Sequence, residues 1–117
     1  MLKSSGFTLI ELIIVVGMIG VLSVIMVPNL TRARTVAQNR AAQAYANNVY
    51  KAATAYTAES IGNNLVLGSC KISYTAGAYT MYPSGNTISS CSVSDVNSDN
   101  LPEIVVISVT GYTFSLP

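Results

Sequence analysis

Histidine is absent from this sequence, and cysteine occurs only twice. A catalytic site that uses histidine as a general base is therefore excluded, and so is a transition-metal site built from several histidine and cysteine ligands. The sequence also lacks a glycine-rich loop of the type that binds phosphate groups. These absences leave no support for an enzyme.

Charged residues are scarce as well. They make up 9% of the chain, whereas hydrophobic residues make up 50%. A soluble monomer of 117 residues has a small core and would expose much of this apolar surface. We therefore expect a membrane or an assembly to cover part of the chain.

Positive charge is nearly missing from the second half of the sequence. Beyond Thr57 there is one basic residue, Lys71. The acidic residues of the same half are Glu59, Asp95, Asp99 and Glu103. Binding of nucleic acid requires clustered lysine or arginine to neutralise the phosphates. We therefore expect no direct nucleic-acid binding by the C-terminal half.

An uncharged apolar run covers residues 12–27 and stops at Pro28. With the residues that precede it, the run reaches the ~20 residues that a helix needs to cross a bilayer. A secretory signal would place a small-residue cleavage site after the apolar core, and residues 24–28 offer none. We expect cleavage before the core, which makes residues 1–6 a leader peptide and leaves the span in the mature protein.

Glu11 lies near the start of this span and needs a cationic partner. A carboxylate at the centre of a lipid-facing helix costs roughly 2.5–3.5 kcal/mol. Lys3 is the only basic side chain upstream. Cleavage after Gly6 would create an α-amine on Phe7, four residues from Glu11, and this amine is the better partner.

The residues from Gly6 to Val16 read Gly-Phe-Thr-Leu-Ile-Glu-Leu-Ile-Ile-Val-Val. They resemble the class III leader boundary of type IV pilins and of their pseudopilin relatives. The resemblance is highly specific over residues 6–30 and weaker along the following helix. From about residue 61 onward no resemblance is recognisable.

The resemblance implies a life cycle for the chain. A prepilin peptidase cleaves after Gly6 and methylates the amine of Phe7. Glu11 then pairs with that amine on a neighbouring subunit, and the helices bundle into a helical homopolymer. The precursor resides in the inner membrane with the pilus assembly machinery, and the filament is an extracellular pilus on the cell surface. Such filaments serve twitching motility, adhesion or DNA uptake, and no cofactor is required.

Two further residues of the span bear on assembly. In related filaments the segment that corresponds to Gly20–Pro28 often loses its helical structure, and Pro28 removes one backbone hydrogen bond from the helix. Gly20 also belongs to a small-residue ridge with Gly17 and Ser23, which would let another helix approach closely. The alternative is the ordinary tolerance of glycine in membrane helices.

Two other functions remain open. A pseudopilin of a type II secretion system would build a short periplasmic piston by the same physics. A membrane-anchored binding domain would use the apolar run as an anchor only, and it would leave Glu11 without a purpose.

The sequence predicts an α+β fold, in which a long N-terminal helix packs on a small antiparallel β-sheet head. The predicted segments are the leader 1–6, a transmembrane half-helix 7–28, an amphipathic half-helix 29–60 and a β-sheet head 61–117. In the amphipathic half, the apolar stripe is expected at Leu30, Ala33, Ala37, Ala41, Ala44, Val49, Ala52 and Tyr56. The head is expected to hold four or five strands, with a hairpin around Gly77.

Both cysteines, Cys70 and Cys91, lie in the predicted head. If the head lies outside the cytoplasm, an oxidising compartment favours a disulfide between them. Such a bond would stabilise the fold by about 3 kcal/mol. A zinc or redox pair is the alternative, but the sequence has neither a CxxC spacing nor a histidine to support it.

A loop rich in oxygen-bearing side chains spans residues 95–103. Its positions 1, 3, 5 and 9 match the first part of a calcium-binding loop, although the twelfth position of an EF-hand falls on Val106. The predicted calcium ligands are Asp95, Asn97, Asp99, Glu103 and the backbone carbonyl of Leu101. The alternative is a turn rich in Asp and Asn that binds no metal.

Overall fold

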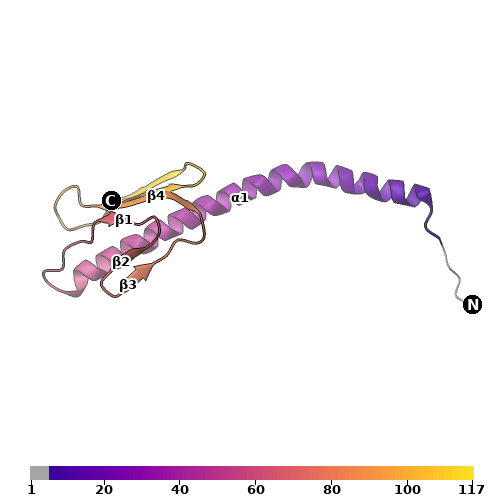
Figure 1. Cartoon of the computed structure of the whole chain (residues 1–117). Helices are drawn as coiled ribbons and strands as arrows, with labels where there is room; N and C mark the ends of the chain where they lie inside the picture. Colours follow the sequence, from indigo (N-terminus) through magenta and orange to yellow (C-terminus); the bar gives the residue numbers. More distant parts are fainter. Residues whose placement is uncertain (1–5) are drawn as a thin grey trace, which may run out of the picture. The chain divides into compact units, whose positions relative to one another are not determined.

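The computed structural model describes residues 6–117, so that most of the predicted leader lies outside the described residues. Within them, one helix and six strands follow in the order α1, β1, β2, β3, β4, β5 and β6 (Figure 1). The chain divides into two compact units, and the boundary falls between Arg34 and Thr35. The long helix and the antiparallel sheet confirm the predicted α+β fold. The four segment boundaries given above stay predictions.

Helix α1 runs from Leu9 to Glu59. The helical conformation continues through Pro28, although proline lacks the N–H that would donate to the carbonyl four residues back. Close by, the side-chain amide of Asn29 donates to the carbonyl of Ile25 at 3.2 Å. After the helix, Gly62 adopts a φ of 110°, a left-handed conformation that glycine takes without steric cost.

The buried face of α1 belongs to the second unit. The buried helical residues are Ala42, Tyr45, Ala46, Val49, Ala52 and Ala53. This face differs from the predicted stripe, in which Val49 and Ala52 were right while Ala37 and Ala44 are exposed. The error arose from a five-residue step between Ala44 and Val49, which shifted the predicted stripe out of phase with the 3.6-residue period. Alanine occurs on several faces of this helix, so periodicity alone did not identify the buried one.

A four-stranded antiparallel sheet has the strand order β1-β4-β5-β6. Strands β1 (Gly68–Ser69), β4 (Ile88–Ser94), β5 (Glu103–Ser108) and β6 (Thr113–Leu116) form it. In β5 buried and half-buried residues alternate, so that the fully buried Ile104 and Val106 lie on the same face of the strand. The core of the second unit therefore lies between this sheet and the alanine-rich face of α1.

The remaining strands, β2 (Tyr74–Ala76) and β3 (Tyr79–Met81), form a separate two-stranded sheet. The hairpin predicted around Gly77 is present, but its strands do not join the larger sheet. Gly77 has a φ of 58°, and a Cβ atom added to it would lie 2.6 Å from the ring of Tyr56. The hairpin turn therefore rests directly on a side chain of α1.

A polar cluster fixes the far end of β5 against α1. Ser108 is fully buried, and its hydroxyl donates to Oδ1 of Asn39 at 2.9 Å. The hydroxyl of Thr110 also donates to Asn39 Oδ1, and the backbone N–H of Tyr112 donates to the Ser108 hydroxyl at 3.1 Å. The turn between β5 and β6 is thus held to the helix by hydrogen bonds and not by apolar packing alone.

Candidate functional site

The start of α1 is a capping box formed by Thr8 and Glu11. The Glu11 Oε2 atom accepts hydrogen bonds from the Thr8 backbone N–H at 2.9 Å and from the Thr8 hydroxyl at 2.8 Å. In return, the Glu11 N–H donates to the Thr8 hydroxyl at 3.4 Å. Sequence reasoning named Glu11 but missed Thr8, although the T-x-x-E signature was visible.

The second oxygen of the Glu11 carboxylate, Oε1, has no hydrogen-bond donor among the residues that the structure describes. All hydrogen bonds to this carboxylate from residues 6–117 reach Oε2, and Oε1 accepts none from them. The Glu11 side chain is exposed, so Oε1 is accessible to a donor from outside the chain. The carboxylate is therefore oriented by its own chain and keeps one acceptor for a partner.

Gly6 and Phe7 precede the helix and are both exposed. The Phe7 side chain keeps 77% of its surface accessible. A Cβ atom added to Gly6 would meet no atom within 4 Å, so the fold itself does not require glycine at this position. Any requirement for glycine at residue 6 would have to come from another protein that acts on it.

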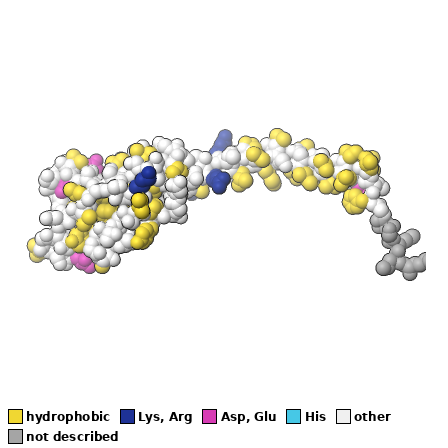
Figure 2. Space-filling view, in the orientation of Figure 1, with side chains coloured by type: hydrophobic (Ala, Val, Ile, Leu, Met, Phe, Trp, Pro, Cys, Tyr) yellow, Lys and Arg dark blue, Asp and Glu magenta, His cyan; other side chains and the backbone are white. Residues whose placement is uncertain are grey.

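Between Leu12 and Val27 the first unit carries no charged side chain and is mostly apolar. Every described residue up to Arg34 is exposed. Hydrophobic side chains follow one another along this part of the helix on the face shown in Figure 2. Among the described residues, α1 is the one helix that is long and apolar enough to cross a membrane. Gly20 lies within this surface, and a Cβ atom added there would meet no atom within 4 Å.

The predicted disulfide is present in the second unit. Cys70 and Cys91 are bonded, with their Cα atoms 4.9 Å apart. Both cysteines are buried in the core, and the Cys70 N–H donates to the Cys91 carbonyl at 3.1 Å. The hydroxyl of Tyr45 donates to the Cys70 carbonyl at 2.7 Å, which ties the bridge to α1. Burial raises the pKa of that tyrosine hydroxyl.

The predicted calcium loop is folded as a turn in which the Asp95 carboxylate accepts hydrogen bonds from backbone N–H groups of the same loop. Oδ1 of Asp95 accepts the N–H of Asp99 at 3.2 Å, and Oδ2 accepts the N–H of Asn100 at 3.1 Å. The Asn100 side chain accepts the N–H of Leu65 and donates to the Asn63 carbonyl. Ser98 and Asn100 both have positive φ.

The predicted ligands are not gathered into one cage. Within residues 6–117, no group of three or more His, Cys, Asp or Glu side chains is placed to hold a metal ion. Asn97, Asp99 and Glu103 instead line one side of an open cavity of about 340 Å³, together with Val96, Leu101 and Pro117. Calcium at this loop stays a prediction.

Comparison with known proteins finds one similar curated protein, the Type IV wide pilus major component PilA4 of Thermus thermophilus. The two sequences are 43% identical over 51 residues, which are 44% of this chain and 39% of the relative. The chain thus matches about two fifths of the length of this relative. No family model matches the chain, and no solved structure gives a significant match. The similarity to PilA4 and the long apolar N-terminal helix together support a type IV pilin, as the residues from Gly6 to Val16 indicate.

Proposed function

We propose that the chain is the precursor of a type IV pilus subunit, and that its function is to polymerise. The observation that carries this proposal is the apolar surface of the first unit, which residues 6–117 leave uncovered. In the precursor this surface would lie in the inner membrane. In the filament it would be covered by the same surface of other copies, with the second units outside.

The capping box supports a specific role for Glu11 in this assembly. Cleavage after Gly6 would break the bond before Phe7 and leave the Thr8 N–H intact, so the box would survive processing. Thr8 would continue to hold Oε2, and Oε1 would accept the methylated amine of Phe7 from a neighbouring subunit. An ion pair of this kind removes the cost of an uncompensated carboxylate in an apolar core.

Several properties follow from this function. The subunit acts as a structural component and not as an enzyme, which the similarity to a pilus component supports. The buried disulfide suits a head that folds outside the cytoplasm and then lies on an extracellular pilus. The expected partners are other copies, the prepilin peptidase and the assembly machinery of the inner membrane. Twitching motility, adhesion and DNA uptake are the activities that the filament would serve.

Isolation of surface filaments tests the proposal. The main subunit of the filaments should be this chain, and mass spectrometry should find its N-terminus at Phe7 with one added methyl group. Gly6→Leu should abolish this maturation without unfolding the chain, because residue 6 has free space around it. Filaments that contain an intact Met1, or a normal mature subunit in the Gly6→Leu strain, would contradict the proposal.

A further inference from the structure

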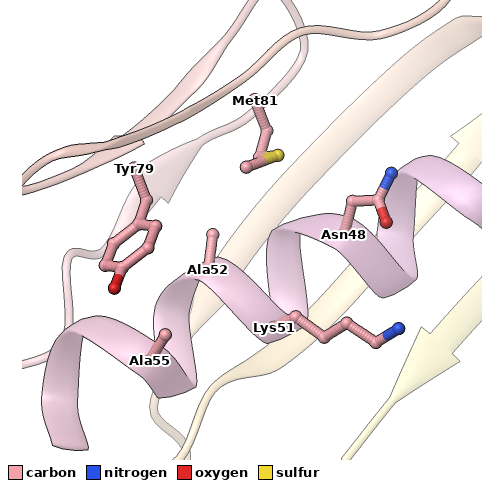
Figure 3. Close-up of a pocket in the computed structure, with 6 residues that line it drawn as sticks. All are labelled: Asn48, Lys51, Ala52, Ala55, Tyr79 and Met81. Atoms are coloured by element: carbon pink, nitrogen blue, oxygen red, sulfur yellow. The ribbon is translucent and has the colours of Figure 1, made fainter.

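A groove runs along the second unit between α1 and the β2–β3 hairpin (Figure 3). Its volume is about 310 Å³. The residues that line it are Asn48, Lys51, Ala52, Ala55, Tyr79 and Met81. The helix contributes the first four and strand β3 the last two, so the groove depends on how the hairpin rests on the helix.

The groove has an apolar floor and one charge. Ala52, Ala55 and Met81 provide the apolar surface, and Lys51 is the only charged residue of the lining. Lys51 is exposed and forms no ion pair with any of residues 6–117. The hydroxyl of Tyr79 donates to Oε1 of Glu59 at 3.3 Å, which engages the nearest acidic group of the helix. The groove is thus suited to an apolar side chain that lies next to a carboxylate.

The same chain carries a surface with the complementary chemistry. Outside α1 the second unit has three carboxylate side chains, and all of them lie in or next to the loop between β4 and β5. We call residues 95–103 the acidic loop. It exposes two apolar side chains, Val96 with 69% and Leu101 with 55% of their surface accessible. Asp99 is exposed and uses only Oδ1 within residues 6–117, where that atom accepts the Leu101 N–H.

The acidic loop is preorganised for contact. Asp95 binds two backbone N–H groups within the loop, and Asn100 ties the loop to Asn63 and Leu65. These bonds fix the shape of the loop, so little conformational entropy would be lost on binding. The loop belongs to the four-stranded sheet and not to the hairpin that forms the groove. No residue of the acidic loop lines the groove of the same chain.

We propose that the groove of one copy receives the acidic loop of a second copy. Val96 packs on the alanine floor, and Asp99 Oδ2 accepts a hydrogen bond from the Lys51 ammonium group. The two surfaces are different parts of the molecule, so the contact is heterologous and extends from copy to copy as a helical filament requires. This inference rests on the proposed polymerisation and names the surfaces that the heads use.

A zero-length carbodiimide cross-linker tests the contact in intact filaments, because it joins an amine to a carboxylate only where the two touch. Removal of the leader leaves two lysines, Lys51 and Lys71, so the cross-linked peptides are easily assigned. Mass spectrometry should find Lys51 joined to Asp99 or its loop neighbours in filaments, and not in the detergent-solubilised monomer. A loop joined to Lys71 instead, or a Lys51 that reacts with Glu59 alone, would overturn the inference.

A charge exchange provides the second test. Lys51→Glu should lower the filament yield about tenfold, and Asp99→Lys in the same chain should restore much of it. Lys71→Glu is the matched control and should leave the yield unchanged. Lack of restoration, or an equal loss with Lys71→Glu, would reject the groove as the binding surface. Absence of filaments from the unmodified chain would instead reject the polymerisation itself, so the two failures are distinguishable.

Discussion

The two oxygens of the Glu11 carboxylate have different surroundings, and this difference separates two roles of the residue. Oε2 accepts both bonds of the capping box, and Oε1 accepts none from the described residues. Glutamine at this position can still accept the Thr8 bonds but carries no charge. We expect Glu11→Gln to preserve the start of the helix and to lower the filament yield at least tenfold.

Glu11→Ala is the matched variant, because it removes the capping bonds as well as the charge. It should lower the yield to a similar degree and also destabilise the first helical turn by about 1 kcal/mol. Hydrogen exchange of the detergent-solubilised chain should show faster exchange around Thr8 for the alanine variant only. Both variants should be found in the membrane. Wild-type filament yield from Glu11→Gln would show that the charge has no role in assembly.

Gly77 allows a second test with an internal control. Gly77 and Gly85 have nearly equal φ values, 58° and 61°, but only an added Cβ atom at Gly77 would meet the ring of Tyr56. Gly85→Ala should therefore cost roughly 1 kcal/mol of unfolding free energy for the left-handed backbone alone. Gly77→Ala should cost about 2–3 kcal/mol, because the hairpin must also move away from α1. Urea unfolding of the solubilised chain measures both, and equal costs would contradict a close contact with Tyr56.

Sequence reasoning identified single residues where a physical cost is visible in the sequence itself. A carboxylate in an apolar run demands a partner, and Glu11 was therefore recognised. The capping role of Thr8 was also readable, since its partner is three residues away. The contact of Gly77 with Tyr56 was not, because the two residues are brought together only when the hairpin packs on α1.

At the scale of secondary-structure elements, the presence of a helix or hairpin was easier to predict than its buried face or its partner strands. The long helix and the hairpin follow from local patterns, whereas the buried face of α1 depends on which alanines pack against the sheet. Strand β1 was missed, because two residues, Gly68 and Ser69, carry no periodic signal and pair with β4 only in the folded chain. The acidic loop was found from its spacing, but its hydrogen bonds show a turn that its own carboxylates stabilise.

The hydrogen bonds of this turn predict a stabilising role for Asp95 that does not depend on calcium. Asp95→Ala leaves the N–H groups of Asp99 and Asn100 without their side-chain acceptor, which should lower the unfolding free energy by about 1–2 kcal/mol. Asn97→Ala is the matched control, because Asn97 has no side-chain hydrogen bond within residues 6–117 and is a predicted calcium ligand. Thermal melts in the presence of a chelator should show a loss for the Asp95 variant only.

The unmodified chain and the Asn97→Ala variant also test whether the loop binds calcium. If the loop binds calcium, a concentration one hundred times the dissociation constant should stabilise the native state by roughly 2.7 kcal/mol. Asn97→Ala should then lose most of this calcium-dependent gain while it melts normally in chelator. An identical melting temperature with calcium and with chelator would leave the loop as a metal-free turn.

At the scale of the whole molecule, the two units differ in what they bury. All buried residues among residues 6–117 lie in the second unit, from Ala42 to Ser108, and the disulfide lies there as well. A chain that begins at Thr35 therefore keeps the core, and the described residues that it loses are all exposed. We expect it to be soluble and monomeric, and to unfold cooperatively on heating. Aggregation or a broad, non-cooperative melt would show that the first unit contributes to the fold.

This shortened chain also tests whether the head binds DNA. It carries three cationic side chains, Arg40, Lys51 and Lys71, against four carboxylate side chains, so the net charge of its side chains is −1. Each phosphate contact needs a cation. The affinity for duplex DNA falls with salt concentration, and the fall is steeper when more phosphates are contacted. With its cations dispersed, the head should show no binding at micromolar concentration and physiological salt in a fluorescence anisotropy titration. Micromolar binding that weakens as salt is added would contradict this and would assign a DNA-binding surface to the head itself.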